Sequence, residues 1–539
     1  MKNTSLFHQF LTDNKIQYIF GNPGTTETPI MNALEGEKEV EYILGLQENS
    51  VIGIAAGYAL ASENIAMVNI HTYPGLANAM CNLYSAYRSK IPLLITAGQQ
   101  DRKHLSIDPI LSGPLTDLAS TATKSAKEIH FEGDFQFELQ RAINIAKKAP
   151  EGPTFVSIPM DTVNAEVGTN YRTLTPIKTT FKNEVAVESI RELLLTEKQK
   201  LGKVVLLVDG IATNANKALI AFAENIQADI YSTPFPVKIP VPSTHYLYKG
   251  AFPAFASKQQ NTLEHYDLIF VIGDALDSFL FDDFTVIPKG KTVVQINTNN
   301  DKVGEYFPVN YSLIGAIKPI FENLNQVLKT LHLIKTVDPE KEKKHYKVLL
   351  ENQHTILNRK DTAFKIDRVA LEVVSKIKEE NDIVLEASSY EGDLKSSIKR
   401  EKAGNVYTAP RGGGLGWGMP VAIGLSLATK KHSVCFVGDG GFQYSLQAIY
   451  TAKKYSIPVV FIVLNNGAYK VLKELWKYQF PKTTEEDYHE LDLKPEVDIL
   501  AISKGYGAAT FNPKDYKELN KMMEEALKIQ GPSVINVKM

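Results

Sequence analysis

HSVCFVGDGG at residues 432–441 and PVVFIVLNNG at residues 458–467 are the two stretches that decide the fold of this chain. Each is a continuous apolar run that ends in a short polar turn containing glycine. A strand that is covered on both faces of a parallel sheet is apolar throughout rather than alternating. Between the two runs, apolar residues recur with the spacing of one helix face, at Phe442, Leu446, Ile449 and Tyr450. The segment therefore predicts a strand, one amphipathic helix and a second, parallel strand.

Polar residues stand at the carboxyl ends of both predicted strands. A right-handed crossover brings these two ends to the same edge of the sheet, so Asp439 and Asn466 can share one Mg²⁺, with a main-chain carbonyl near Ala468 as a further ligand. The backbone N–H groups of Gly440 and Gly441, at a helix start, suit a phosphate. Taken alone, Gly-Asp-Gly is equally an ordinary turn with Asp as helix N-cap. The matched Asn466 favours a metal-diphosphate site.

The same alternation of strand and helix recurs in two earlier parts of the chain. In residues 1–165 the strand-like runs are IQYIFG, VEYILGL, IAMVNIH and IPLLITAG, and the helix-like runs are SVIGIAAGYALAS and ANAMCNLYSAYRS. A second block contains KVVLLVDG, ADIYSTP, LIFVIGD and TVVQIN, and the last block adds NDIVLEAS and PSVINVKM. This alternation predicts an α/β protein of doubly wound parallel sheets, with ligands beyond the carboxyl ends of the strands. The charged run at 338–347 predicts a solvated helix or linker.

The bulk composition points to small-molecule partners. A chain of 539 residues is too long for one core and predicts about three domains. Its formal charge of -2 shows no basic surplus for nucleic acid. No apolar run is long enough for a membrane span and the N-terminus lacks a signal-peptide pattern, so we expect a cytoplasmic protein without membrane partners. Both cysteines, Cys81 and Cys435, stand in apolar surroundings and are expected to be buried thiols.

The GDG at 438–440, followed by the NN at 465–466, resembles the cofactor motif of thiamine-diphosphate (ThDP) enzymes. Two shorter matches support the resemblance, GGGLG at 412–416 and SSY at 388–390. Longer segments resemble the 2-oxoacid decarboxylases of this group, and benzoylformate decarboxylase most of all: FGNPGTTETP (20–29), YILGLQENSVIGIAAGYA (42–59), NIHTYPGLANAM (69–80), ITAGQQ (95–100) and LNNGAYKVL (464–472).

The resemblance covers nearly the whole chain and implies its domain organisation. It places an N-terminal domain that binds the ThDP pyrimidine at residues 1–170, a central α/β domain at 186–335, and a domain that binds the diphosphate and Mg²⁺ at 365–539. In this family the two half-sites of one active site come from different subunits. A homodimer is therefore the minimum active unit implied, and a homotetramer is expected.

The resemblance also implies which residues contact the cofactor. Glu48 corresponds to the catalytic glutamate that protonates the pyrimidine ring, although an acidic residue at a helix start is also favoured by the helix dipole alone. Gly413 would offer a main-chain acceptor to the ring's amino group, and Leu415 would wedge under the cofactor. The remaining expected contacts are Ser388, Ser389, Gly440, Gly441, Ala468, Tyr444 and Tyr469, and the two tyrosines could equally be packed aromatic residues.

On the substrate side, the resemblance assigns Thr25 to the substrate carboxylate and His71 to proton transfer. A lone histidine after a strand is commonly structural, but the surrounding motif favours catalysis. The second active-site histidine of benzoylformate decarboxylase aligns with Leu280, so one proton relay is missing. An apolar pocket is expected from Leu111, Leu280, Val471, Leu472 and Leu475, for which core packing is the alternative.

The implied reaction is the non-oxidative decarboxylation of a 2-oxo acid to an aldehyde and CO₂, through a C2 ylid and an enamine, with ThDP and Mg²⁺ as cofactors. An acetolactate synthase-like carboligase is the alternative, because an enamine that is not protonated promptly can be captured by a second carbonyl compound. A third hypothesis is a ThDP-fold protein that binds the cofactor without catalysis. The presence of Glu48, His71, Asp439 and Asn466 together argues against that third hypothesis.

Overall fold

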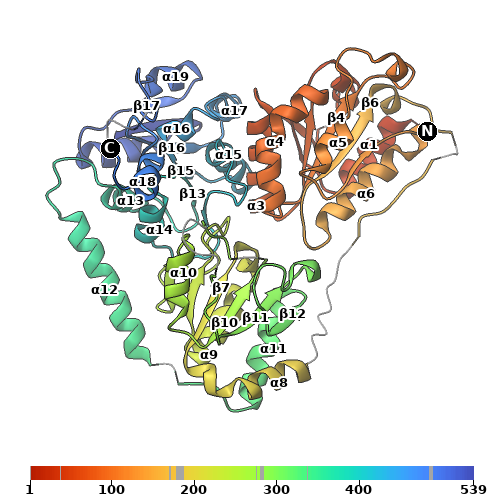
Figure 1. Cartoon of the computed structure of the whole chain (residues 1–539). Coiled ribbons are helices and arrows are strands. Elements are labelled where there is room, and N and C mark those ends of the chain that lie inside the picture. Colours follow the sequence, from red (N-terminus) through yellow and green to blue (C-terminus); the bar gives the residue numbers. More distant parts are fainter. Residues whose placement is uncertain are drawn as a thin grey trace. The chain divides into compact units, whose positions relative to one another are not determined.

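Three six-stranded sheets flanked by helices make up the computed structural model (Figure 1). The structure describes residues 2–36, 38–168, 171–177, 187–274, 276–279, 285–336, 338–484, 488 and 490–539. All strand pairs with a described register are parallel, which confirms the predicted doubly wound α/β class. The chain divides into two compact units, residues 1–179, 381–389 and 409–539 in one and residues 180–380 and 390–408 in the other.

The N-terminal sheet has the strand order β2-β1-β3-β4-β6-β5. Its strands are β1 (Tyr18–Asn22), β2 (Glu41–Leu44), β3 (Ala66–Ile70), β4 (Leu93–Gln99), β5 (Ala126–Glu128) and β6 (Thr154–Pro159). The helices are α1 (Asn3–Asp13), α2 (Thr28–Ala33), α3 (Glu48–Ser62), α4 (Thr72–Arg88), α5 (Leu115–Ser120), α6 (Phe135–Lys147) and α7 (Met160–Val163). The fully buried β3 and β4 are the apolar runs that the sequence predicts.

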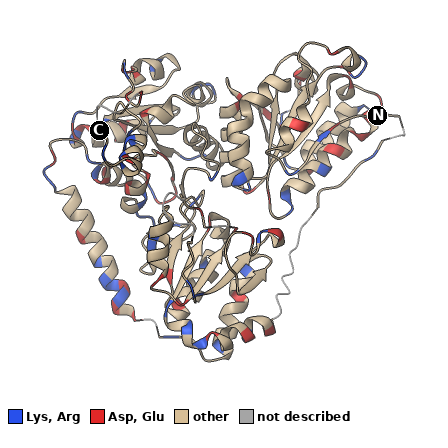
Figure 2. Ribbon diagram, viewed as in Figure 1, with Lys and Arg blue, Asp and Glu red and all other residues tan. Residues whose placement is uncertain are grey.

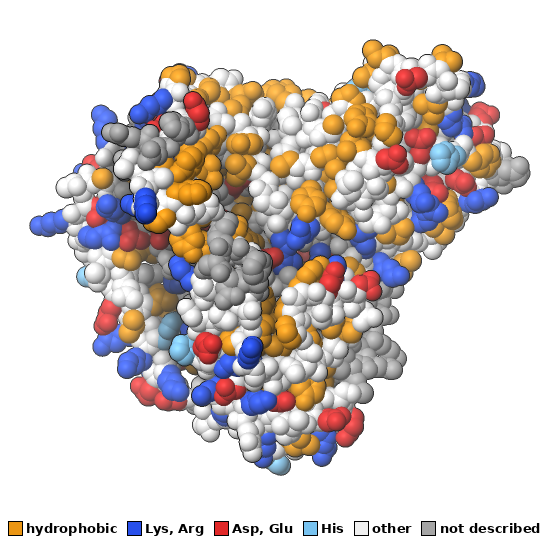
Figure 3. All heavy atoms as spheres, in the orientation of Figure 1, with side chains coloured by type: hydrophobic (Ala, Val, Ile, Leu, Met, Phe, Trp, Pro, Cys, Tyr) orange, Lys and Arg blue, Asp and Glu red, His pale blue; other side chains and the backbone are white. Residues whose placement is uncertain are grey.

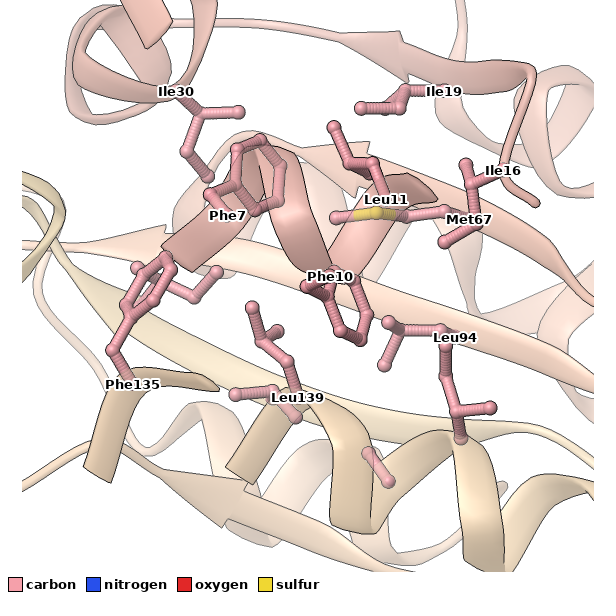
Figure 4. Close-up of a cluster of buried hydrophobic side chains, with 14 of the residues drawn as sticks. Phe7, Phe10, Leu11, Ile16, Ile19, Ile30, Met67, Leu94, Phe135 and Leu139 are labelled. Carbon is pink, nitrogen blue, oxygen red and sulfur yellow. The ribbon is translucent and has the colours of Figure 1, made fainter. Parts of the chain in front are cut away.

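One face of this sheet is covered by α1 and α6, which close a hydrophobic core (Figure 4). Phe7 and Phe10 of α1 point into it and meet Phe135 and Leu139 of α6. Phe7 and Phe135 contact edge to face with ring centroids 6.1 Å apart. The core fixes the back of the sheet, so the carboxyl ends of its strands are held in register.

The C-terminal sheet has the order β14-β13-β15-β16-β18-β17, which repeats the order of the N-terminal sheet strand for strand. Its strands are β13 (Asp382–Glu386), β14 (Val406–Tyr407), β15 (Ser433–Gly438), β16 (Val459–Asn465), β17 (Ala509–Phe511) and β18 (Pro532–Lys538). The helices are α15 (Gly418–Thr429), α16 (Asp439–Phe442), α17 (Ala448–Lys454), α18 (Lys470–Gln479), α19 (Ile499–Gly505) and α20 (Tyr516–Ala526).

The prediction of one continuous helix between β15 and β16 is wrong, because two separate helices lie there. α16 ends at Phe442, and α17 begins only at Ala448. The residues between them make tighter turns, in which Ser445 N donates to Phe442 O and Ala448 N donates to Ser445 O. The apolar positions still face inward, since Phe442 and Ile449 are fully buried. The periodicity therefore located the buried face correctly but not the break.

Close helix packing joins the N-terminal and C-terminal sheets within their unit. α3 crosses α15 at Gly57 and Gly424, and a Cβ atom on Gly424 would lie 2.0 Å from the backbone oxygen of Ile54. Glycine is required there because the two backbones approach with no room for a side chain. Asn82 of α4 adds polar contacts, donating through Nδ2 to Asn49 O and to Gly416 O.

The second unit contains the central sheet, with the order β12-β11-β10-β7-β8-β9. The strands are β7 (Val204–Val208), β8 (Asp229–Ser232), β9 (Tyr248–Ala251), β10 (Leu268–Ile272), β11 (Thr292–Asn297) and β12 (Tyr311–Ile314). The helices are α8 (Val187–Thr196), α9 (Asn216–Ile226), α10 (Ala256–Leu263), α11 (Ile317–Thr330), α12 (Pro339–Leu357), α13 (Ile366–Val374) and α14 (Glu391–Ser397). If these strands are numbered from β7 and the sheet is read from β9, the order is 3-2-1-4-5-6, which is the arrangement of dinucleotide-binding folds. The other two sheets have a different order.

The charged run at 338–347 forms the start of α12, as predicted for a solvated helix. None of the residues of α12 is buried, and its first turns are rich in Lys and Glu (Figure 2). The expectation that both thiols are buried holds for Cys435 but is wrong for Cys81, which lies on an exposed side of α4 beside Gly414. Within the described residues, every helix is too short or too polar to cross a membrane.

Candidate active site

The strand order of the N-terminal sheet places the carboxyl ends of β1, β2 and β3 side by side, and this edge holds the predicted residues of the first half-site. Ligands bind in such sheets where the chain leaves neighbouring strands toward opposite faces. Thr25 begins a short 3₁₀ turn after β1, Glu48 begins α3 after β2, and His71 directly follows β3. Thr25 is exposed in this chain, whereas Glu48 is buried and His71 is half-buried.

Glu48 is held by two asparagine side chains. Its Oε1 accepts a hydrogen bond from Asn22 Nδ2 at 2.9 Å, and its Oε2 accepts one from Asn78 Nδ2 at 3.2 Å. Gln47 is the N-cap residue of α3, and its side-chain oxygen accepts from Ser50 N. Because the side chain of Gln47 serves as the cap, Glu48 is not needed for that purpose. Its carboxylate instead points toward the start of α4, where Gly75 leaves space beside it.

His71 is oriented by Glu27, a residue that the sequence analysis missed. The Nδ1 atom of His71 lies 2.8 Å from Glu27 Oε2 and 3.2 Å from Thr26 Oγ1. Glu27 is fully buried and also accepts hydrogen bonds from Gly24 N and Gly98 N. A carboxylate at Nδ1 fixes the tautomer and leaves Nε2 for the substrate side.

Two backbone features bring this imidazole into place. A Cβ atom on Gly24 would lie 2.1 Å from His71 Nδ1, so the turn before Thr25 can pass the ring only as glycine. Thr72, which follows His71, has φ of 42°, in the left-handed region that a β-branched residue rarely adopts. Strained residues of this kind concentrate at functional sites. The side-chain hydroxyl of Thr72 is buried without a hydrogen-bond partner.

We expect Glu27→Gln to lower kcat about a hundredfold, because misplacing a reacting group by about an ångström costs that much. The fold should survive, since the amide keeps one acceptor for the surrounding N–H groups. The diagnostic measurement is a double-mutant cycle with His71→Ala. If Glu27 acts through His71, then the double variant is no slower than His71→Ala alone. Additive losses in kcat would show that Glu27 has an independent, structural role.

The second half-site lies at the carboxyl edge of the C-terminal sheet, around Asp439. This residue begins α16 directly after β15 and is 5% exposed. Its Oδ1 accepts from Gly440 N at 3.0 Å and its Oδ2 from Gly467 N at 2.7 Å. The carboxylate thus bridges the turns after β15 and β16, as the sequence predicts. Burial raises the pKa of Asp439, and these N–H groups act against that rise.

Asn466 and Ala468 form the other wall of this corner. Asn466 follows β16, and its Oδ1 accepts a hydrogen bond from Ala468 N at 3.0 Å. Among the described residues, Asp439 has no Lys or Arg within ion-pairing distance. A buried carboxylate without a cationic partner is costly, and carboxylate, amide and main-chain oxygens are the ligands that Mg²⁺ prefers. The corner can therefore hold a hard cation.

Tyr469 and Tyr444 lie beside this corner. The ring of Tyr469 packs against Gly440, where a Cβ atom would lie 2.8 Å from Tyr469 Cε1. Burial, together with the neighbouring Tyr444 hydroxyl, raises the pKa of Tyr469. Tyr444 itself is 50% exposed, so it is not a core aromatic residue in this chain. Gly441 contacts Val437 and the backbone of Glu386 on the inner side of the same turn.

The turn after β13 is tied to α18. Ser389 Oγ accepts a hydrogen bond from Val471 N at 3.0 Å, and Ser388 is exposed beside it. Val471 and Leu475 are half-buried and Leu472 is 45% exposed, so α18 contributes little to the core. Apolar side chains reach the surface over this part of the chain, around the C-terminal sheet (Figure 3). Of these apolar residues, Leu472 faces solvent, while Val471 and Leu475 are partly packed.

The glycine-rich loop before α15 is anchored by Glu386, a second residue that the sequence analysis missed. Its Oε1 accepts from Gly416 N and Trp417 N, and its Oε2 accepts from Gly418 N at 2.7 Å. This buried carboxylate ends β13 and holds the loop that carries Gly413 and Leu415. Gly413 has φ of 70° with open space beside it, and Leu415 is half-buried.

The predicted residues thus form two clusters. Glu48, Thr25 and His71 gather on the N-terminal sheet, and Asp439, Asn466, Ala468 and Ser389 on the C-terminal sheet. Within the described ranges, no hydrogen bond or ion pair joins Glu48 or His71 to Asp439. Leu111 is half-buried in the loop before α5, with φ of 68°. Leu280 lies outside the described residues.

Three family models match the chain in the order of its sheets. The N-terminal TPP binding domain of thiamine pyrophosphate enzymes matches residues 1–125, the central domain matches 187–324, and the C-terminal TPP binding domain matches 386–537. The chain belongs to the thiamine pyrophosphate enzyme family. The deduction from GDG and NN is thereby confirmed at the level of the family and of its ThDP cofactor.

Relatives of this thiamine pyrophosphate enzyme include decarboxylases and carboligases. Benzoylformate decarboxylase of Pseudomonas aeruginosa is 29% identical over 99% of this chain and 98% of its own length. The acetolactate synthase large subunit of Haemophilus influenzae is 24% identical over 98% of this chain and 92% of its own. The crystal structure of benzoylformate decarboxylase from Polynucleobacter necessarius superposes with a TM-score of 0.88, at 27% identity, over 100% of this chain and 98% of that one.

A third relative extends the comparison with solved structures. The thiamine diphosphate-dependent 4-hydroxybenzoylformate decarboxylase of Rhodococcus jostii RHA1 has a TM-score of 0.86, at 25% identity, and covers 100% of this chain and 99% of that chain. Because these two structures align with the chain along its whole length, each of its three sheets has a counterpart in them.

Proposed function

We propose that this ThDP-dependent enzyme is a Mg²⁺-dependent, non-oxidative decarboxylase of a 2-oxo acid, and that it releases an aldehyde and CO₂. The observation that carries the proposal is the Asp439 corner. There, a buried carboxylate without a cationic partner among the described residues meets an amide and two glycine turns at one sheet edge. The resemblance to benzoylformate decarboxylases over the whole chain supports the choice of substrate class.

The residues of this corner fit a magnesium diphosphate. Asp439, Asn466 and the main-chain oxygen of Ala468 would hold Mg²⁺, and phosphate oxygens of the cofactor would be its further ligands. The backbone N–H of Gly441 would donate to the same phosphates, whereas that of Gly440 donates to Asp439 Oδ1. The described residues contain no cluster of three or more His, Cys, Asp or Glu that could hold a metal ion alone. The metal is therefore expected to bind together with the diphosphate.

The pyrimidine end of ThDP would meet Glu48. When bound, ThDP supplies the nucleophilic carbon and the electron sink of the reaction. Glu48 would share a proton with the ring, and the burial of its side chain and its hydrogen bonds from Asn22 and Asn78 support this role. Gly413 and Leu415 would contact the cofactor from the loop that Glu386 anchors. Ser388, Ser389, Tyr444 and Tyr469 would surround its diphosphate side.

His71 and Thr25 would serve the substrate. The Thr25 hydroxyl can donate a hydrogen bond to the carboxylate of a 2-oxo acid. His71, held at Nδ1 by Glu27, can deliver a proton from Nε2 to the carbon that has lost CO₂. The apolar residues Leu111, Val471, Leu472 and Leu475, with Leu280, would enclose the apolar part of the substrate.

The active unit is proposed to be a homodimer at minimum, and a homotetramer in its full assembly. Glu48 and Asp439 sit on separate sheets, and no hydrogen bond or ion pair among the described residues connects their clusters. A partner subunit that brings its Glu48 to this chain's Asp439 would complete both half-sites by symmetry.

Carboligation of the acetolactate synthase kind is the second candidate, and the synthase relatives favour it. Both reactions release CO₂, and they differ in the step after that release. A proton delivered by His71 gives an aldehyde, whereas a second carbonyl compound gives a hydroxyketone. Because Leu280 aligns with the second histidine of benzoylformate decarboxylase, His71 is left as the proton donor on which the outcome depends.

Product analysis separates the two candidates. We expect incubation with benzoylformate, pyruvate or branched 2-oxo acids, in the presence of ThDP and Mg²⁺, to give free aldehyde as the main product by proton NMR. The His71→Ala variant should shift the ratio toward hydroxyketone, because protonation is then slower than capture. Acetoin or acetolactate from the unaltered protein, without free aldehyde, would contradict the decarboxylase proposal and support the carboligase.

A further inference from the structure

A cavity of about 590 Å³ in the second unit of the chain is lined by none of the residues of the proposed active site. It is enclosed by β9, α12 and α13 and by the segment from α14 to Lys399. Small-molecule sites in proteins span roughly 300–1,000 Å³ and combine apolar walls with a few convergent polar groups. This cavity has that size, and its wall combines apolar side chains with a larger share of polar ones.

Lys399 is the feature that sets the chemistry of the cavity. Its side chain is partly buried in the wall, and within the described part of the chain it has neither an ion pair nor a hydrogen bond. Burial lowers the pKa of Lys399, and no carboxylate acts against it. An ammonium group that has lost part of its hydration without gaining a partner is unfavourable. An anion in the cavity would supply that partner.

His345 of α12 is the second polar group that faces the cavity. Its Nε2 atom is buried without a hydrogen-bond partner. Burial lowers the pKa of His345, and the positive charges of Lys249 and Lys399 add to this effect. The two cations and the imidazole therefore lie within electrostatic reach of one another. The orphaned Nε2 is free to donate to an oxygen once the ring carries a proton there.

The carboxylates around the cavity do not neutralise Lys399. Asp367 of α13 accepts two hydrogen bonds from Arg359, at 2.8 and 2.9 Å, which hold its pKa below its usual value. Asp393 of α14 is exposed, and it makes no ion pair with Lys399. Lys249 is paired with Asp229 at 3.2 Å. Lys399 is therefore the partly buried charge of the wall that has no partner, whereas Asp393 is exposed to solvent.

The rest of the wall is partly apolar. Leu349 and Ile356 of α12 and Leu371 of α13 line the cavity, together with the ring of Tyr248. Tyr248 is buried, and its hydroxyl is bonded to Ser232, so the ring is fixed. A ligand that fills this space would bury an apolar body against these side chains and place its anionic group between Lys399 and His345.

We propose that this cavity is a binding site for a small organic carboxylate with an apolar body, held by Lys399 and His345. The proposal does not depend on the reaction at the active site, because every lining residue belongs to the second unit. α14 begins at Glu391, two positions after Ser389 in the sequence. The helix that a bound ligand would contact, α14, therefore directly follows the turn whose Ser389 accepts a hydrogen bond from α18. Through this short connection, ligand binding would regulate the proposed active site.

The test is competitive labelling of lysine in the assembled holoenzyme. Phenylacetate is the probe, because it has an aromatic body, a carboxylate and no 2-oxo group. Trace acetylation with acetic anhydride is followed by peptide mass spectrometry, which reports each lysine separately. At ten times its dissociation constant, phenylacetate should lower acetylation of Lys399 about tenfold, since about one site in ten is then empty. Acetylation of Lys402, an exposed lysine nearby, should stay unchanged.

Two further probes test the chemistry of the site. Phenylacetamide has the same body without the charge, and inorganic phosphate has charge without the body, and neither should protect Lys399. A His345→Gln variant should need about tenfold more phenylacetate for the same protection, whereas His354→Gln, on the exposed side of α12, should not. Equal protection by phenylacetamide or by phosphate, or none by phenylacetate, would overturn the proposal.

Discussion

Replacing Glu48 by Gln is expected to lower the turnover of a 2-oxo acid about a thousandfold, within the range of about 10² to 10⁴ that a positioned general acid or base contributes. The substitution keeps the size of the side chain and one oxygen for Asn22 or Asn78. It removes the carboxylate that would share a proton with the pyrimidine ring. The folded structure should therefore persist while the activation of the cofactor fails.

Two measurements distinguish this loss from a general defect. Exchange of the C2 proton of bound ThDP for deuterium, followed by NMR after rapid acid quench, should slow by a similar factor in Glu48→Gln. Affinity for ThDP should change much less. Glu41→Gln, an exposed glutamate on β2, serves as the matched control and should behave as the unaltered protein. Normal turnover in Glu48→Gln would show that another group activates the cofactor.

Replacing Asp439 by Ala is expected to lower the affinity for ThDP at least a hundredfold when Mg²⁺ is present. Loss of an outer partner of a metal ligand already costs about 10- to 100-fold, and Asp439 is proposed to be a direct ligand. Isothermal calorimetry with ThDP in a magnesium buffer measures this effect. The control is Asp492→Ala, because Asp492 is an exposed aspartate of the same domain that pairs with Lys473.

The Asp439→Ala variant should also show that the loss of ThDP affinity is not caused by a loss of folding stability. Asp439 is a buried carboxylate that lacks a cationic partner among the described residues, so its removal should leave the cofactor-free fold at least as stable as before. Thermal unfolding without ThDP should therefore be unchanged or occur at a higher temperature. The stabilisation by added ThDP and Mg²⁺ should disappear. If ThDP still bound and stabilised the variant normally, the corner would not be the metal site.

Long buried strands were predictable, and short edge strands were not. The runs that became β3, β4, β15 and β16 are mostly apolar and almost entirely buried, because helices cover both of their faces. By contrast, β5 (AKE) and β14 (VY) are two or three residues long at the edges of their sheets, so they carry no pattern to detect. The break between α16 and α17 was missed because apolar spacing reports which face is buried, and a tight turn preserves that face.

The residues of the candidate site were predictable where a sequence motif contains them. They were not predictable where only tertiary contacts bring them into the site. Asp439 and Asn466 follow two apolar strands, so their meeting follows from the topology of a parallel sheet. Glu27 stands in the polar segment GTTETP and Glu386 at the end of a strand, and either could be read as a surface residue. Each is buried only because backbone N–H groups from distant segments converge on its carboxylate. A buried acid that accepts such bonds has no local sequence signature.

Release of labelled CO₂ from a 2-oxo acid is the step that the decarboxylase and carboligase reactions share, so its measurement decides whether this chain performs ThDP-dependent decarboxylation at all. Benzoylformate, pyruvate and 4-methyl-2-oxovalerate, each labelled at the carboxyl carbon, are incubated with the protein, ThDP and Mg²⁺, and the gas is analysed by mass spectrometry. We expect labelled CO₂ from at least one of these acids, and none when ThDP is omitted or Mg²⁺ is chelated. Release that persists without ThDP, or no release with both cofactors present, would rule out the proposed ThDP- and Mg²⁺-dependent decarboxylation.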